Sequence, residues 1–159
     1  NVNLMSNEDG NHYIPELIDV INIIPKYMML NIEIKYYKSS QKTIIEDALH
    51  LFDKYDLYQN TIISSFNPFI LRAIKKRNIN IPIALIWDGK LKFIKTWLKL
   101  LKPSAFHMHI DFIDNGIMPW IHSRNIKVYI YTVNSKNDYE KVIQHKVDGV
   151  FTDVNSFNK

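Results

Sequence analysis

The chain has 159 residues, of which 47% are hydrophobic and 23% charged, a composition typical of globular proteins that excludes long disorder and collagen-like repeats. It contains no Cys, which excludes a disulfide framework, thiolate zinc sites and Cys nucleophiles. The net charge of +4 mildly favours an anionic partner, but a coding bias toward Lys and Asn explains the same charge without any ligand.

Length and composition predict a single domain over residues 1–159. No apolar run reaches the roughly 18 residues of a membrane-spanning helix, and the N-terminus has neither the basic start nor the apolar core of a signal peptide. Because the chain begins with Asn1 rather than Met, we expect it to be a processed product or an excerpt, from which any targeting segment could have been lost.

Short segments rich in β-branched and aromatic residues alternate with segments of helical periodicity. The predicted strands are residues 28–35, 61–66, 83–87, 105–110, 127–134 and 149–153. The predicted helices are residues 14–24, a segment capped by Ser40, residues 67–78, 91–101 and 115–124, and a segment capped by Ser135 that ends near Lys146.

Strand–helix alternation predicts a parallel sheet with crossover helices. In residues 30–35, Leu30, Ile32 and Ile34 share one face, whereas Asn31, Glu33 and Lys35 share the other, and a doubly wound sheet would be apolar on both faces. Polar residues near strand ends favour a (β/α)8 barrel. Such a barrel needs about 200–250 residues, so we predict an incomplete one that holds about the last five to six strand–helix units.

Glu33 and Lys35 lie two residues apart on one predicted strand, so their side chains point the same way. A carboxylate and an ammonium in this arrangement can hold a divalent cation beside an anionic oxygen, as phosphoester chemistry requires. A salt bridge inside a barrel would place the same two residues together. One carboxylate is also too few for Mg²⁺ or Ca²⁺, which bind about six or more oxygens.

Residues 62–68 form a strand that ends in small hydroxyls and leads into a helix. Backbone N–H groups at such a junction can bind phosphate, but we expect Asn67 only to cap the helix. Phe66 lies where it could wall an apolar part of a pocket.

His107 and His109 alternate on one predicted strand, followed by Asp111. This spacing could hold a metal, but two imidazoles without a third fixed ligand are more often side chains at a barrel rim or in solvent, which is our expectation. Residues 91–102 predict a basic amphipathic helix. It could lie on an anionic membrane, but we expect an outer barrel helix with a solvated Lys face.

Several motifs, in order, resemble the glycerophosphodiester phosphodiesterase family over residues 14–153. They are the segments 14–20 (IPELIDV), 30–35 (LNIEIK), 63–67 (ISSFN), 131–134 (YTVN) and 147–153 (VDGVFTD). The resemblance implies a (β/α)8 barrel that hydrolyses glycerophosphodiesters to glycerol 3-phosphate and an alcohol with the help of Mg²⁺ or Ca²⁺.

The resemblance also implies roles for individual residues. Glu33 matches a metal-ligand glutamate and Lys35 a lysine near the substrate phosphate, while Phe66, Tyr131 and Asn134 match substrate-binding positions. The family usually has Trp where Tyr131 stands.

The family's His-Arg-Gly, its Glu-x-Asp pair and its second His are not found in this sequence, and His12 matches neither catalytic His. The chain therefore lacks the general acid and base and two of the metal carboxylates, so the chain alone should be close to inactive. An open barrel should also associate with itself or with a complementing chain, because it exposes strand edges.

Three alternatives to this enzyme remain, two of them non-enzymatic. A split or degenerate barrel could serve only as a binding or assembly partner. A nucleic-acid binder is suggested by charge alone, and no interleaved basic and aromatic residues support it, so we expect no nucleic-acid partner. A related phospholipase-type barrel acting on phosphoinositides would differ in head-group preference, which the sequence does not settle.

Overall fold

The computed structural model describes residues 5–6, 12–35, 41–114 and 116–155. Its centre is a parallel six-stranded sheet in the order β3-β4-β5-β6-β7-β8. The strands are β3 (Leu30–Glu33), β4 (Thr61–Ser65), β5 (Ile83–Trp87), β6 (Ala105–His109), β7 (Lys127–Tyr131) and β8 (Gly149–Val150). Each strand pairs with its neighbour in sequence, as in a barrel built from successive strand–helix units.

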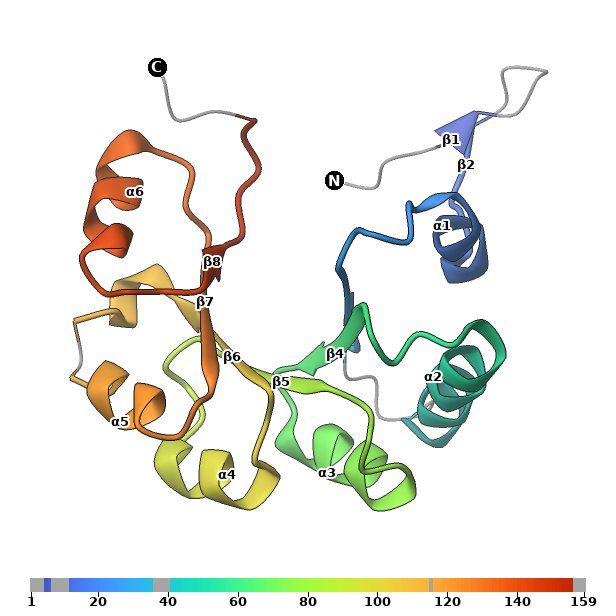
Figure 1. The fold of residues 1–159 in the computed structure, drawn as a ribbon, viewed down its shortest axis with the longest axis horizontal. Helices are drawn as coiled ribbons and strands as arrows, with labels where there is room; N and C mark the ends of the chain where they lie inside the picture. Colours follow the sequence, from blue (N-terminus) through green and yellow to red (C-terminus); the bar gives the residue numbers. More distant parts are fainter. Residues whose placement is uncertain (1–4, 7–11, 36–40, 115, 156–159) are drawn as a thin grey trace.

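The sheet curls, and the helices lie around its outer side (Figure 1). They are α1 (Leu17–Ile23), α2 (Gln41–Tyr55), α3 (Pro68–Arg77), α4 (Ile94–Leu101), α5 (Met118–His122) and α6 (Lys136–Ile143), with a short 3-10 helix η1 (Ile110–Phe112) after β6. All six predicted strands are present, β5 with the predicted bounds and the other five in shorter form. A short antiparallel pair, β1 (Met5–Ser6) with β2 (His12–Tyr13), was not predicted.

Two of the predicted helix caps are confirmed. The Asn67 side chain accepts the Phe69 N–H at 2.9 Å at the start of α3, and Ser135 Oγ accepts the Asp138 N–H at 3.1 Å in α6. Both bonds satisfy a backbone donor that has no partner within the helix. The predicted cap Ser40 lies outside the described residues.

Other helix ends differ from the prediction. Pro15 precedes α1 instead of lying in its first turn, because the next residue, Glu16, is the cap. The Glu16 N–H donates to Asp19 Oδ2 at 2.9 Å. The helix predicted from residue 91 begins at Ile94, since Phe93 has a left-handed backbone with φ of 57°. A left-handed residue cannot continue a right-handed helix.

The two faces of the sheet differ in chemistry. Fully buried apolar residues such as Ile63, Leu85 and Phe106 alternate along the strands and belong to the core between sheet and helices. The intervening positions form the inner face, where Glu33 pairs in register with Ser64, and His107 with Tyr129. Of the polar residues predicted on one face of residues 30–35, Asn31 and Glu33 therefore lie on the inner side of the curled sheet.

β3 and β8 form the two edges of this sheet, so the barrel is not closed by the described residues. This confirms the predicted incomplete (β/α)8-type fold. None of the described helices has the length and hydropathy of a bilayer-spanning segment.

Candidate active site

A cavity of about 200 Å³ opens on the inner face near the carboxyl ends of the strands. In (β/α) barrels this end carries the active site, because the loops that follow the strands converge there. The residues that line the cavity are Asn31, Glu33, Phe66, Ile86, His107, Tyr131 and Phe151. Three of the five residues predicted from the sequence, Glu33, Phe66 and Tyr131, are therefore brought together although nearly 100 residues separate the first from the last.

Among the described residues that line this cavity, Glu33 is the only one with a carboxylate, and its side chain is exposed. Its backbone is fixed, because the next residue, Ile34, donates its N–H to Ser64 O at 2.8 Å and accepts a hydrogen bond from Ser65 Oγ at 2.7 Å. The Glu33 carboxylate makes no hydrogen bond or ion pair with any described residue. A carboxylate held on a rigid strand end without a partner is available to a ligand.

Tyr131 ends β7 and lies across the cavity from the Glu33 strand. Its hydroxyl is buried and has no hydrogen-bond partner among the described residues. Burial raises the pKa of Tyr131, and the negative charges of Asp88 and Glu33 raise it further. The phenol is therefore protonated at neutral pH and can donate a hydrogen bond into the cavity.

Aromatic rings fill the inner face in two layers. In the deeper layer, the His107 ring lies 5.5 Å from Tyr129 and 4.8 Å from Phe151 between centroids. In the upper layer, the Tyr131 ring lies 5.4 Å from His109 and 6.3 Å from Phe66. The layers give the cavity rigid apolar walls below and beside its polar groups.

Of the two histidines, only His107 differs from the expectation of a side chain at the barrel rim or in solvent. His107 is only 3% exposed, and burial lowers its pKa to about 4, so its imidazole is neutral at physiological pH. His109 is part exposed, and its Nδ1 accepts the Asp111 N–H at 3.3 Å, so it caps η1. The Asp111 carboxylate also lies 3.3 Å from His109 Nδ1.

Asp88 and Gly89 follow β5 and were not singled out by sequence reasoning. The Asp88 carboxylate lies 2.7 Å from Lys90 Nζ. Partial burial would raise the pKa of Asp88, but the hydrogen bonds and charge of Lys90 lower it more, so the carboxylate is ionised. Gly89 has φ of 86°, and a Cβ at this position would overlap the Phe112 ring.

Lys35 and Asn134 do not line the cavity. Lys35 is exposed just beyond β3. Asn134 joins the loops after β7 and β8: its Nδ2 donates to Asp153 Oδ2 at 2.9 Å, and its Oδ1 accepts the Asp153 N–H at 2.9 Å and the Thr152 hydroxyl at 3.3 Å. Both lie at the carboxyl-end side of the sheet, where the sequence placed them.

A divalent cation fits the described residues only in part. Within the ranges that the structure describes, no group of three or more His, Asp, Glu or Cys side chains could hold a metal. Glu33 has the oxygen donors that Mg²⁺ and Ca²⁺ prefer and no competing partner. It can be one ligand of a cation whose other ligands lie outside the described residues.

Four residues that line the cavity, Asn31, Ile86, His107 and Phe151, were not predicted as site residues. Asn31 could have been found from period-two alternation with Glu33, and His107 from its alternation with His109. Ile86 and Phe151 carry no sequence signal, because apolar residues on the inner and outer faces of a strand look alike.

Comparison with known proteins agrees with this architecture. The chain belongs to the glycerophosphoryl diester phosphodiesterase family, which matches residues 2–155. A glycerophosphodiester phosphodiesterase of Caldanaerobacter subterraneus subsp. tengcongensis is 32% identical over 144 residues, and the match covers 88% of this chain and 58% of that protein. The chain thus spans about three fifths of the length of this curated relative.

Solved structures show the same fold. The chain superposes on a glycerophosphoryl diester phosphodiesterase of Silicibacter pomeroyi with a TM-score of 0.79 at 15% identity, covering 92% of this chain and 55% of the other. A phosphodiesterase of Oleispira antarctica, solved in complex with the product sn-glycerol-3-phosphate, gives a TM-score of 0.77 at 25% identity, covering 92% and 60%. The resemblance stated from the motifs is confirmed.

Proposed function

We propose that residues 1–159 are a single domain that forms the C-terminal part of a glycerophosphodiester phosphodiesterase barrel. The reaction is hydrolysis of a glycerophosphodiester to glycerol 3-phosphate and an alcohol. The observation that carries this proposal is the cavity in which the unpartnered Glu33 carboxylate, the buried Tyr131 hydroxyl and the Phe66 ring meet. Family membership and the glycerol 3-phosphate bound to the Oleispira antarctica relative support the same substrate class.

In this proposal Glu33 is one ligand of a divalent cation, Mg²⁺ or Ca²⁺. Such a cation, when bound, polarises a phosphoryl oxygen and neutralises developing negative charge. Tyr131 donates a hydrogen bond to an oxygen of the substrate, and Lys35 offsets the charge of the phosphate. Phe66 and Phe151 supply apolar walls against the carbon atoms of the glycerol.

No proton-transfer role is assigned to the described histidines. The pKa of His107, about 4, leaves it a weak base, and rings surround it. The resemblance places the general acid and base in motifs outside the described residues, and the proposal follows it. We expect the chain alone to be inactive and the full-length protein to hydrolyse its substrate.

Glu33→Gln in the full-length protein tests the proposal. We expect hydrolysis of glycerophosphocholine to fall on the order of 100-fold, because the substitution removes an anionic ligand from a cation whose charge stabilisation is worth several kcal/mol. The dependence of the rate on Mg²⁺ or Ca²⁺ concentration should shift to higher concentration. Release of glycerol 3-phosphate and choline is the measurement.

Glu46→Gln, the same chemical change on the outer helix α2, is the matched control and should leave the rate unchanged. If Glu33→Gln retained full activity and metal dependence, Glu33 would not be a ligand. If the unsubstituted full-length protein hydrolysed no glycerophosphodiester, the alternative of a non-catalytic barrel would replace this proposal.

A further inference from the structure

The basic residues of the chain are concentrated in one region. Residues 57–110 contain nine Lys and Arg residues and a single acidic residue, Asp88, whereas the rest of the chain contains eleven basic and fifteen acidic residues. The formal charge is therefore +8 in this region and −4 in the remainder. Among the described residues, only Lys90 of these nine cations forms an ion pair with a carboxylate. The net charge of +4 is thus the sum of two regions of opposite charge.

The same region exposes large apolar side chains on α3 and α4, which lie side by side on the outer side of the sheet (Figure 1). Phe93 is 80% exposed, Phe69 59% and Leu100 54%. The half-buried Trp97 packs edge-on against Phe69, with ring centroids 5.1 Å apart. We call these four residues, together with Lys92, Lys95 and Lys99, the α3–α4 face.

The spacing within α4 explains why this face exists. Leu98 and Leu101 are buried and attach the helix to the sheet. Phe93, Trp97 and Leu100 recur at intervals of four and three residues, so they follow a second stripe directed outward. An outer barrel helix needs only the first stripe, so barrel packing does not account for the second.

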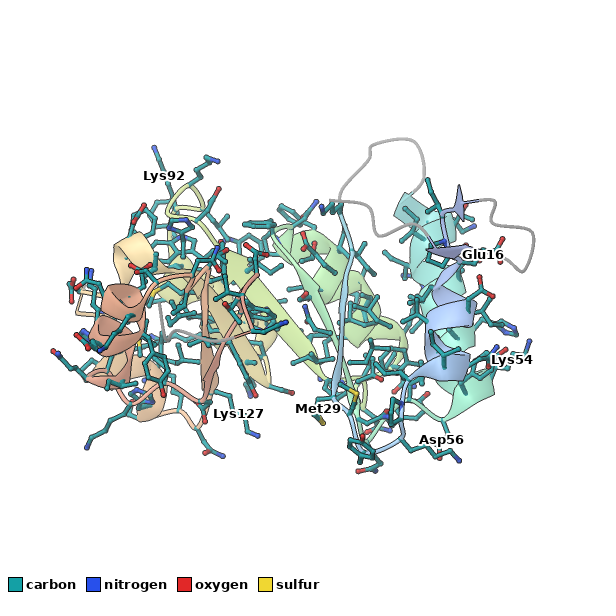
Figure 2. All side chains as sticks on the ribbon, turned by 90° about the horizontal axis from the view of Figure 1, so that it is seen from above. Glu16, Met29, Lys54, Asp56, Lys92 and Lys127 are labelled. Carbon is teal, nitrogen blue, oxygen red and sulfur yellow. The ribbon has the colours of Figure 1, made fainter. Side chains whose placement is uncertain are left out.

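The α3–α4 face reaches the end of the molecule where the cavity opens. Figure 2 shows Lys92 at the edge opposite Met29 and Lys127, which lie at the starts of strands. Phe69 belongs to the first turn of α3, three residues after Phe66, which lines the cavity.

We propose that the α3–α4 face binds the surface of an anionic lipid membrane. Exposed Phe, Trp and Leu side chains beside Lys residues match the interfacial zone of a bilayer, where rings enter the head-group region and ammonium groups meet acidic lipids. Charge complementarity selects an anionic surface. A nucleic acid is disfavoured because Leu100, which is 54% exposed, offers nothing to bases or phosphates. The mouth of the cavity lies beside the lipid surface in this arrangement.

Sedimentation of the full-length protein with phosphatidylcholine vesicles, made with and without phosphatidylglycerol, tests the proposal. We expect binding only to the vesicles that contain phosphatidylglycerol, with affinity falling as salt rises. Phe93→Gln with Leu100→Gln should weaken this binding about tenfold or more. Lys92→Gln with Lys99→Gln should weaken it and flatten the salt dependence.

Lys136→Gln with Ile143→Gln on α6 makes the same chemical changes away from the α3–α4 face and should leave vesicle binding unchanged. Melting temperatures of all variants establish that they fold. Failure to bind either vesicle, equal binding to both, or binding unaffected by the Phe93 and Leu100 substitutions would each overturn the proposal. Tighter binding to a single-stranded RNA oligomer than to vesicles would overturn it in favour of nucleic acid.

Discussion

Ser64 and Tyr131 have buried hydroxyls without a hydrogen-bond partner among the described residues, and of the two only Tyr131 lines the cavity. A buried hydroxyl without a hydrogen bond costs about 1–3 kcal/mol, and no described residue offsets this cost. Groups that are left strained or unsatisfied in the free protein are often found at functional sites, where a ligand supplies the missing interaction. This is the physical reason for assigning the Tyr131 hydroxyl to substrate binding.

We expect Tyr131→Phe to leave the free energy of unfolding unchanged or to raise it by about 1 kcal/mol, because the substitution removes an unsatisfied polar atom and keeps the ring. Hydrolysis by the full-length protein should fall. Urea unfolding and the hydrolysis rate are the two measurements. A loss of stability would mean that the hydroxyl has a partner within the folded protein.

Gly89 and Gly116 provide a matched pair for separating two effects of a side chain. Both have positive φ, 86° and 74°, so Ala is strained at either position. At Gly89 the new Cβ would also collide with the Phe112 ring, whereas at Gly116 no atom lies within 4 Å.

We therefore expect Gly89→Ala to destabilise by about 1–3 kcal/mol more than Gly116→Ala, since it forces a ring out of a packed contact. Thermal unfolding of the two variants measures the difference. Phe112→Ala combined with Gly89→Ala should reduce the penalty attributable to the collision. Equal effects of the two glycine substitutions would show that Phe112 moves aside without cost.

At the scale of elements, the ends of β7 and β8 are joined by Asn134, which forms hydrogen bonds with Asp153 and Thr152. The resemblance assigns substrate binding to the same residue. Substitution of Asn134 distinguishes the two roles. Loss of a residue that joins the two loops lowers stability, whereas loss of a substrate contact raises KM.

We expect Asn134→Ala to destabilise by about 1 kcal/mol, because it removes hydrogen bonds to Asp153 and Thr152 at an exposed position where water replaces them in part. Amide exchange at residues 152–153 should accelerate. Ser135→Ala, which removes only the cap of α6, is the comparison and should cost about 1 kcal/mol without affecting Asp153. An unchanged stability together with a raised KM would favour direct substrate contact.

The strands and helices themselves could be predicted well from local pattern. Asn67-Pro68 and Ser135 mark helix starts through caps that act within three residues. The starts of α1 and α4 were misplaced because Glu16, not a residue before Pro15, caps α1 and because Phe93 has a left-handed backbone. Period-two alternation in residues 30–35 correctly separated the inner from the outer face.

At the scale of the whole molecule, the neutral His107 within the aromatic layer makes stability depend on pH. Its pKa is lowered to about 4 by burial, against about 6.5 in an unfolded chain. Between these two values the unfolded chain binds a proton that the folded protein does not. Stability should therefore decrease as pH falls from about 6.5 to about 4.

We expect His107→Phe to remove this part of the pH dependence, which is on the order of 3 kcal/mol at most. Urea unfolding at a series of pH values measures it. His122→Gln, at an exposed position on α5, should leave the curve unchanged. If the stability of His107→Phe fell with pH as steeply as that of the unsubstituted protein, His107 would have to gain a compensating partner when it is protonated.

The sequence by itself determined the alternation of strands and helices, the incomplete parallel barrel and the family, since each rests on local periodicity or on motifs in order. Only the tertiary structure decided that Glu33, Phe66 and Tyr131 line one cavity, that His107 is buried and neutral, and that Asn134 is bonded to Asp153. It also decided that Phe69, Phe93 and Leu100 form one exposed face beside lysines that make no ion pair with a described carboxylate. The reason is physical. Burial, pairing and shared faces depend on which residues distant in the chain become neighbours, and local patterns do not contain that information.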